Sequence, residues 1–415
     1  MGIVAITALG LAGIWAAFPS GRAILVDWTA KAALAAKQGA GIAPDRAEVE
    51  ASWRDRRDGR EARTREGYRR IFDGLSPACR DFLRLGGLGP DEAVIRWGNY
   101  DMSLLMSSKV FERDDGGRYY RLRPNVRSVW FRQPDLFDVD TCQFLLPETP
   151  DVLGAAKRAG AVPVSGSGQT TNSWGCRGPE PDLAAPVRGL VLGDSFMQGM
   201  FIGDAETPPA CLARHLESDL GTRVSILNTG HLGYSPEHYY NTLRAYLERL
   251  QPQFVVVAYY ANDFGLERDV IQGKGDWGEA NHWFEKVIRE CTRSGAFSVF
   301  APIPDQGQLF GNRNPGHYPC RAVNDLGLPG PYFCDPTEAF LDEDLRLERR
   351  LGRVVGRKSP LYNARLGDGH LSPLGADLWG RTVARRLALL LASRGTTGTK
   401  SHAAEPGPIV VVRGE

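Results

Sequence analysis

The segment Gly193-Asp194-Ser195 contains the serine that is best placed to do chemistry. It follows the apolar run 189–192, which has the character of a buried strand, so the serine would lie in a sharp turn at the end of that strand. Active sites of open α/β sheets lie at the carboxyl edge of the strands. Because a serine hydroxyl is a weak nucleophile, it needs a base, a group that orients the base, and donors for an oxyanion.

A candidate base lies far along the chain. His370 is preceded by Asp368 in the sequence Asp-Gly-His. A carboxylate at that place can hold the imidazole in the tautomer that accepts a proton, and it can stabilise the charged ring. We therefore predict that Ser195, His370 and Asp368 form a nucleophile, a base and its orienting acid.

Candidate oxyanion donors follow three predicted strands. The first is the backbone N–H of Ser195 itself. The second is the N–H of Gly233, five residues after the strand end at Asn228, where a glycine would let the backbone approach a ligand closely. The third is the amide of Asn262, which follows a strand of β-branched and aromatic residues. Each signal alone also fits a polar turn or a helix cap, but their order and strand context agree.

With these residues in place, the chain resembles the SGNH or GDSL hydrolases, whose sequence blocks contain Ser, Gly, Asn and His. Ser195, Gly233, Asn262 and His370 match the blocks in that order, and 171–178 resembles a lead-in segment of bacterial members. Two details differ: Ala261 replaces the usual glycine before the asparagine, and the acid and histidine are spaced Asp-x-His rather than Asp-x-x-His. The resemblance covers roughly residues 165 to 392. It implies esterase or acyl-transfer chemistry.

The predicted elements of this region alternate between strand and helix. Such a βαβ series predicts a parallel sheet with right-handed crossovers and helices on both faces, hence a three-layer α/β/α fold of the flavodoxin-like, SGNH hydrolase-like kind. We expect strands at 189–192, 224–227, 254–260 and 296–301, and helices at 207–220, 236–250, 280–293 and 373–393. The loops 264–278 and 302–335 would lie at the end of the sheet where the site is. Their aromatic residues Trp277, Tyr318 and Tyr332 could stack on a sugar or pack the loops down.

The rest of the chain suggests further segments. Residues 2–18 form an uncharged apolar run without a basic segment before it, which favours an uncleaved transmembrane helix over a cleaved signal. Basic residues after the run favour a cytoplasmic domain, whereas the family resemblance favours the periplasm, which we adopt. The predicted divisions are a membrane anchor at 1–21, a charged helical region at 22–90, a small β-rich platform at 91–164, the catalytic domain at 165–394 and a flexible tail at 395–415.

Composition narrows the classes of function. The 415 residues have a net charge of +1, so no overall attraction to nucleic acid is expected. We find no glycine-rich phosphate loop and no Cys-x-x-Cys pair, and we predict neither a cofactor nor a metal. The seven cysteines leave at least one thiol unpaired, and Cys320 and Cys334 could form a disulfide or remain free.

Two functions fit these observations. The first is a membrane-anchored serine esterase that acts on acyl or O-acetyl esters of a glycan or a lipid. The second is a hydrolase-like structural subunit of a membrane complex, with partner subunits bound through the N-terminal helices and the C-terminal tail. The complete set of site residues favours the enzyme, although a fold alone does not prove activity. An acyltransferase that uses the same residues would have the same sequence pattern.

Overall fold

The computed structural model describes residues 65–96, 104–114, 119–132, 143–265, 270, 277–306, 309, 318, 326, 332–352, 359–363 and 369–394. The chain divides into two units, residues 1–69 and 70–415, and the fold below is that of the second. The expected anchor at 1–21, most of the charged region and the tail at 395–415 lie outside the described residues. Within the described ranges, no helix has both the length and the apolar character that a membrane span requires.

A five-stranded parallel sheet forms the centre of the fold, with strand order β10-β9-β11-β12-β13. This order is that of the flavodoxin-like folds, and it places the topological switch point between β9 and β11. β11 and β12 are buried along their whole length, as their continuous apolar sequences require. The strands are β9 (Val187–Leu192), β10 (Val224–Asn228), β11 (Phe254–Tyr259), β12 (Phe297–Pro302) and β13 (Tyr332–Phe333).

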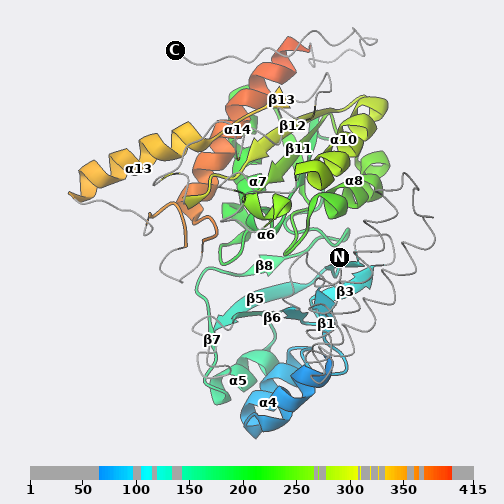
Figure 1. Ribbon diagram of the computed structural model, residues 1–415, viewed down its shortest axis with the longest axis vertical. Helices are drawn as coiled ribbons and strands as arrows, with labels where there is room; N and C mark the ends of the chain where they lie inside the picture. The colour runs from blue at the N-terminus through cyan, green and yellow to red at the C-terminus, as the bar shows by residue number, and fades with distance from the viewer. Residues whose placement is uncertain are drawn as a thin grey trace, which may run out of the picture. The chain divides into compact units, whose positions relative to one another are not determined.

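Helices cover both faces of this sheet, which gives the three layers predicted from the sequence (Figure 1). On one face, α7 (Pro208–Leu220) and α14 (Pro373–Ser393) pack against inward side chains of the strands such as Val256. On the other face, α8 (Pro236–Leu250) and α10 (Trp277–Ser294) pack against side chains such as Val257. Successive residues of β11 thus enter opposite layers, because side chains alternate along a strand.

The predicted core elements lie close to the observed ones. The helices expected at 236–250 and 373–393 are found with those bounds, whereas α10 starts earlier, at Trp277. α13 (Thr337–Leu351) and the two-residue β13 were not predicted. The loops expected at 264–278 and 302–335 lie largely outside the described residues.

Short antiparallel strands precede the parallel sheet. β3 (Phe111–Asp114) and β4 (Tyr119–Leu122) form a hairpin, and β5 (Arg127–Arg132) pairs with β6 (Gln143–Pro147), β7 (Val162–Pro163) and β8 (Gln169–Thr170). β1 (Val94–Arg96) pairs with β2 (Leu104–Met106), and the helices are α4 (Pro77–Leu85) and α5 (Pro150–Arg158). We call residues 94–170 the β-region. Its Tyr120 and Trp130 belong to the same apolar core as residues of α8, so the β-region packs directly on the sheet domain.

Candidate active site

The predicted nucleophile lies in a tight turn between β9 and α6 (Ser195–Gln198). A Cβ atom at Gly193 would lie 2.4 Å from Cγ of Met197, so only glycine fits where the strand enters the turn. Asp194 caps the helix, because its Oδ1 accepts a 2.9 Å hydrogen bond from the N–H of Phe196. Ser195 is the first residue of the helix, so its own N–H has no acceptor within the helix.

The predicted base reaches this serine. Nε2 of His370 lies 2.7 Å from Oγ of Ser195, which is a short hydrogen bond across 175 positions of sequence. In the neutral ring with a proton on Nδ1, the hydroxyl donates to Nε2, the direction needed for general-base catalysis. The other predicted partner of the ring, Asp368, lies outside the described residues, so its role as the orienting acid stays a prediction.

Neighbouring backbone and aromatic rings hold His370 in place. An isolated antiparallel bridge pairs Tyr362 with Leu371, and the N–H of Asn363 donates to the carbonyl of His370 over 2.8 Å. The imidazole packs against the ring of Phe196, with centroids 4.5 Å apart, and lies edge-on to Phe201 at 6.4 Å. The imidazole thus contacts Phe196, in the helical turn that contains Ser195, and Phe201, just after that turn.

The loop after β10 is tied to the backbone of that helical turn. Asn228 accepts a hydrogen bond from the N–H of Gly230 through Oδ1 and donates from Nδ2 to the carbonyl of Met197. A Cβ atom at Gly230 would lie 2.4 Å from the backbone nitrogen of Gln198. The absence of a side chain at Gly230 thus allows the loop to lie directly on α6.

Gly233 occupies a turn that follows this loop. The N–H of Tyr234 closes the turn by donating to the carbonyl of His231 over 3.1 Å, and Gly233 has a positive φ of 73°, which glycine adopts without strain. The N–H of Leu232 donates to Oε1 of Gln198 over 2.6 Å. Among the described residues, no acceptor takes the N–H of Gly233, and its role as an oxyanion donor stays a prediction.

Asn262 lies in the 3-10 helix η2 (Ala261–Phe264), directly after β11. Its Nδ2 lies 3.4 Å from Oδ2 of Asp194, so the amide is oriented toward the residue that precedes the nucleophile. The next residue, Asp263, accepts hydrogen bonds from the N–H of Tyr260 and the hydroxyl of Tyr239. Burial raises the pKa of the Asp263 carboxyl well above its usual value, and the nearby carboxylate of Asp194 raises that pKa further.

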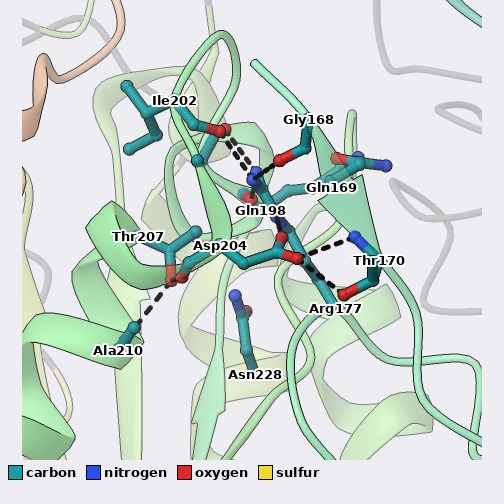
Figure 2. Close-up of polar contacts among 12 residues, drawn as sticks. Gly168, Gln169, Thr170, Arg177, Gln198, Ile202, Asp204, Thr207, Ala210 and Asn228 are labelled. Atoms are coloured by element: carbon teal, nitrogen blue, oxygen red, sulfur yellow. Dashed lines mark hydrogen bonds and ion pairs between the residues drawn. The ribbon is translucent and has the colours of Figure 1, made fainter. Parts of the chain in front are cut away.

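A buried arginine fixes the chain that leaves α6 (Figure 2). Only 1% of the Arg177 side chain is exposed, and its Nε donates to Oδ1 of Asp204 over 2.8 Å. Its terminal nitrogens donate to backbone carbonyls, including those of Gln198 and Ile202, each over 2.6 Å. Burial lowers the pKa of Arg177, and the carboxylate of Asp204 opposes this effect. Arg177 also pairs through its backbone with Asn228 at the edge of the sheet.

The segment that Arg177 holds contains an unusual backbone conformation. Phe201 has a positive φ of 65°, which is sterically unfavourable for a bulky residue. Arg177 donates to the carbonyls of Gly199 and Ile202, on either side of this residue. The ring of Phe201 packs between Trp130 and His370. Such strain persists only where the surroundings fix the backbone, and Arg177 supplies that restraint.

Several residues next to the site could not be identified from the sequence alone. Arg177 belongs to the lead-in segment that resembles the family, but nothing in the sequence shows that its partners are backbone carbonyls. Gln198 and Tyr120 contact Leu232, in the loop after β10, from a helix and a distant strand, so only the fold brings them there. The loop aromatics Trp277 and Tyr318 are buried against other aromatic side chains, which leaves them packed rather than exposed for stacking on a sugar.

One of the two cysteines that could pair lies in the described part of the chain. Cys334 is a free, buried thiol there, and burial raises its pKa to about 12, whereas Cys320 lies outside the described residues. The described residues contain no group of three or more His, Cys, Asp or Glu side chains that could hold a metal ion.

Comparison with solved structures gives several matches. They include a protein from Desulfitobacterium hafniense assigned to the lipolytic G-D-S-L family (14% identity, TM-score 0.29, 48% of this chain and 98% of that one). They also include a lipase/acylhydrolase from Enterococcus faecalis (16%, 0.34, 49% and 96%) and an acetylxylan esterase from Geobacillus stearothermophilus (15%, 0.33, 48% and 94%).

No family model and no curated protein matches the chain. Since the structural matches extend over about half of the chain with TM-scores of 0.29 to 0.34, any assignment of activity depends on the geometry of the residues themselves.

Proposed function

We propose that this protein is a serine hydrolase of carboxylic esters, with Ser195 as the nucleophile and His370 as the base. The observation that carries the proposal is the 2.7 Å contact between Oγ of Ser195 and Nε2 of His370. The serine lies at the switch point of the sheet, where ligands of open α/β folds bind. Its surroundings include N–H donors of the kind that acyl transfer requires.

The proposed reaction proceeds in two halves. His370 takes the proton of the Ser195 hydroxyl as Oγ attacks the ester carbonyl, and the carbonyl oxygen becomes an oxyanion. The backbone N–H groups of Ser195 and Gly233 and the amide of Asn262 stabilise that oxyanion. His370 then gives its proton to the departing alcohol, which leaves an acyl group on Ser195. A water molecule, deprotonated by His370, attacks this acyl-enzyme and releases the acid. Asp368 is proposed to orient His370 and to stabilise its charged form.

The proposed substrates are acyl or O-acetyl esters of a glycan or a lipid. We also propose, from the apolar run at 2–18, that the protein is anchored in a membrane with the enzyme in the periplasm. Recovery of the full-length protein in the soluble fraction after a carbonate wash would contradict the anchor.

A labelling experiment tests the nucleophile directly. The full-length protein should react with a fluorophosphonate probe and hydrolyse p-nitrophenyl acetate, whereas Ser195→Ala should do neither. Loss of the nucleophile of such a triad typically reduces kcat by a factor on the order of 10⁴ or more. Ser298→Ala is a matched control, because Ser298 is a buried serine of strand β12, which β11 separates from β9. Equal labelling of folded Ser195→Ala and wild-type protein would refute the proposal.

A second substitution tests the oxyanion role of Asn262. Asn262→Ala should lower kcat by roughly 10²–10³-fold with little change in KM, because the amide would act mainly on the charge that develops in the transition state. A rise in KM at unchanged kcat would instead make Asn262 a group that binds the substrate in its ground state.

A further inference from the structure

The peptide that links Leu232 to Gly233 is held at its carbonyl end. The C=O of Leu232 and the N–H of Gly233 belong to one peptide group, and in a planar trans peptide these two bonds point in opposite directions. A contact that fixes the carbonyl therefore also fixes the direction of the N–H. Under the proposed function, this N–H is one of the donors to the oxyanion.

The main contact to that carbonyl comes from the β-region. The hydroxyl of Tyr120, in β4, donates to the carbonyl oxygen of Leu232 over 3.0 Å. In return, the hydroxyl of Tyr234 donates to the carbonyl of Tyr120 over 2.7 Å. Nδ1 of His231 lies 3.3 Å from the same oxygen of Leu232. The turn and the strand are thus joined by hydrogen bonds in both directions.

The rings around this contact leave little freedom to move. His231 and Tyr234 are stacked, with centroids 4.4 Å apart and planes inclined by 10°. The ring of Tyr120 meets both of them edge-on, at 5.1 Å and 5.6 Å. Tyr120 is fully buried, so its hydroxyl keeps one orientation, and bulk water cannot easily replace the hydrogen bond if the hydroxyl is removed.

We propose that Tyr120 is a positioning residue of the active site, which orients the Gly233 N–H toward the oxyanion through the Leu232–Gly233 peptide. This inference rests on the proposed function. It gives the β-region a specific part in the reaction: the strand β4 completes the oxyanion hole from outside the three-layer fold. Tyr120 acts in this proposal through the peptide that it holds and not on the substrate.

The test removes the hydroxyl and keeps the ring. Tyr120→Phe should lower kcat for p-nitrophenyl acetate by about 10-fold and leave KM within about twofold, because a displaced donor loses part of the 10²–10³-fold effect of a whole donor. The affinity of a boronic acid inhibitor, whose tetrahedral adduct on serine carries a negative charge, should fall by a similar factor. Tyr234→Phe removes the reciprocal bond and should reduce kcat by less.

Tyr246→Phe is the matched control. Tyr246 is a buried tyrosine of α8, and its hydroxyl donates to the carbonyl of Trp174 over 2.9 Å, so its loss has a similar structural cost without touching the turn. If Tyr120→Phe and Tyr246→Phe lose the same thermal stability and keep the same kcat and inhibitor affinity, Tyr120 is only structural and the inference is wrong. If the wild-type protein neither turns over the ester nor labels at Ser195, the proposed function fails and the inference fails with it.

Discussion

Arg177 offers the sharpest test of how this site is held together. The guanidinium pairs with Asp204 and donates to the backbone carbonyls of Gln198, Gly199 and Ile202, while 1% of its side chain is exposed. Arg177→Ala leaves these acceptors without their donor in the interior. Arg177→Lys keeps the charge but has three N–H groups in place of the five in the planar fork.

The expected loss of stability follows from the burial of the Arg177 side chain. Breaking a buried ion pair by removing one partner costs about 3–5 kcal/mol. With about 2–4 °C of melting temperature per kcal/mol for a domain of this class, Arg177→Ala should lower Tm by roughly 6–20 °C. Arg177→Lys should lower Tm by about half as much, because the lysine retains the pairing with Asp204 and some of the carbonyl contacts.

Substitution of Arg177 should also lower kcat, because it would displace Phe201. Without the restraint from Arg177, the positive φ of Phe201 would relax, since such strain costs about 1–3 kcal/mol. Its ring would then leave His370, so kcat of the Lys variant should fall at temperatures well below its Tm. Thermal melts followed by circular dichroism, together with kcat at 20 °C, measure both effects. A drop in Tm below about 2 °C for Arg177→Ala, or unchanged kcat for Arg177→Lys, would refute this reasoning.

Two further predictions concern Gly230, in the loop after β10, and Asp377, in α14. Gly230→Ala should abolish turnover, since its Cβ would lie 2.4 Å from the backbone of α6, whereas Gly74→Ala, with no atom within 4 Å, should be silent in a kinetic assay. Burial alone would raise the pKa of Asp377, but hydrogen bonds from His215 and Arg214 lower it below its usual value. The Asp377 carboxylate therefore contributes fully to stability above about pH 4, and this contribution is lost as the pH falls further. Melts of Asp377→Asn at pH 7 and pH 3 should show a small deficit, about 0–1 kcal/mol, only at the higher pH.

Much of the sheet domain could be predicted from periodicity. The runs 189–192 and 254–259 are continuous and apolar because both faces of these strands are covered by helices. α8 could be located because Ser235 and Pro236 mark its start and its apolar residues recur on one face. The pairing of Ser195 with His370 was predicted because a serine nucleophile needs a base, and the Asp-Gly-His sequence offers one that also matches the family resemblance.

Other features depend on tertiary structure that one sequence does not show. β13 has only two residues, which is too short for any periodic signal, and it gains its pairing only from the fully formed edge of β12. Tyr120 and Arg177 donate hydrogen bonds to backbone carbonyls, and every residue has the same backbone carbonyl group. No pattern of side chains could therefore have identified Leu232 or Ile202 as their partners.

The position of His370 has a consequence for the synthesis of the protein. The histidine lies just before α14, which is the last helix of the described residues and packs on α7. Ribosomes add about 5–20 residues per second, so the 175 positions between Ser195 and His370 take roughly 10–35 s to translate. During that interval the strands β10 to β13 are synthesised, but the serine has no base. On the proposed mechanism, a nascent or truncated chain cannot hydrolyse cellular esters until its final helix docks, and premature termination yields an inert product.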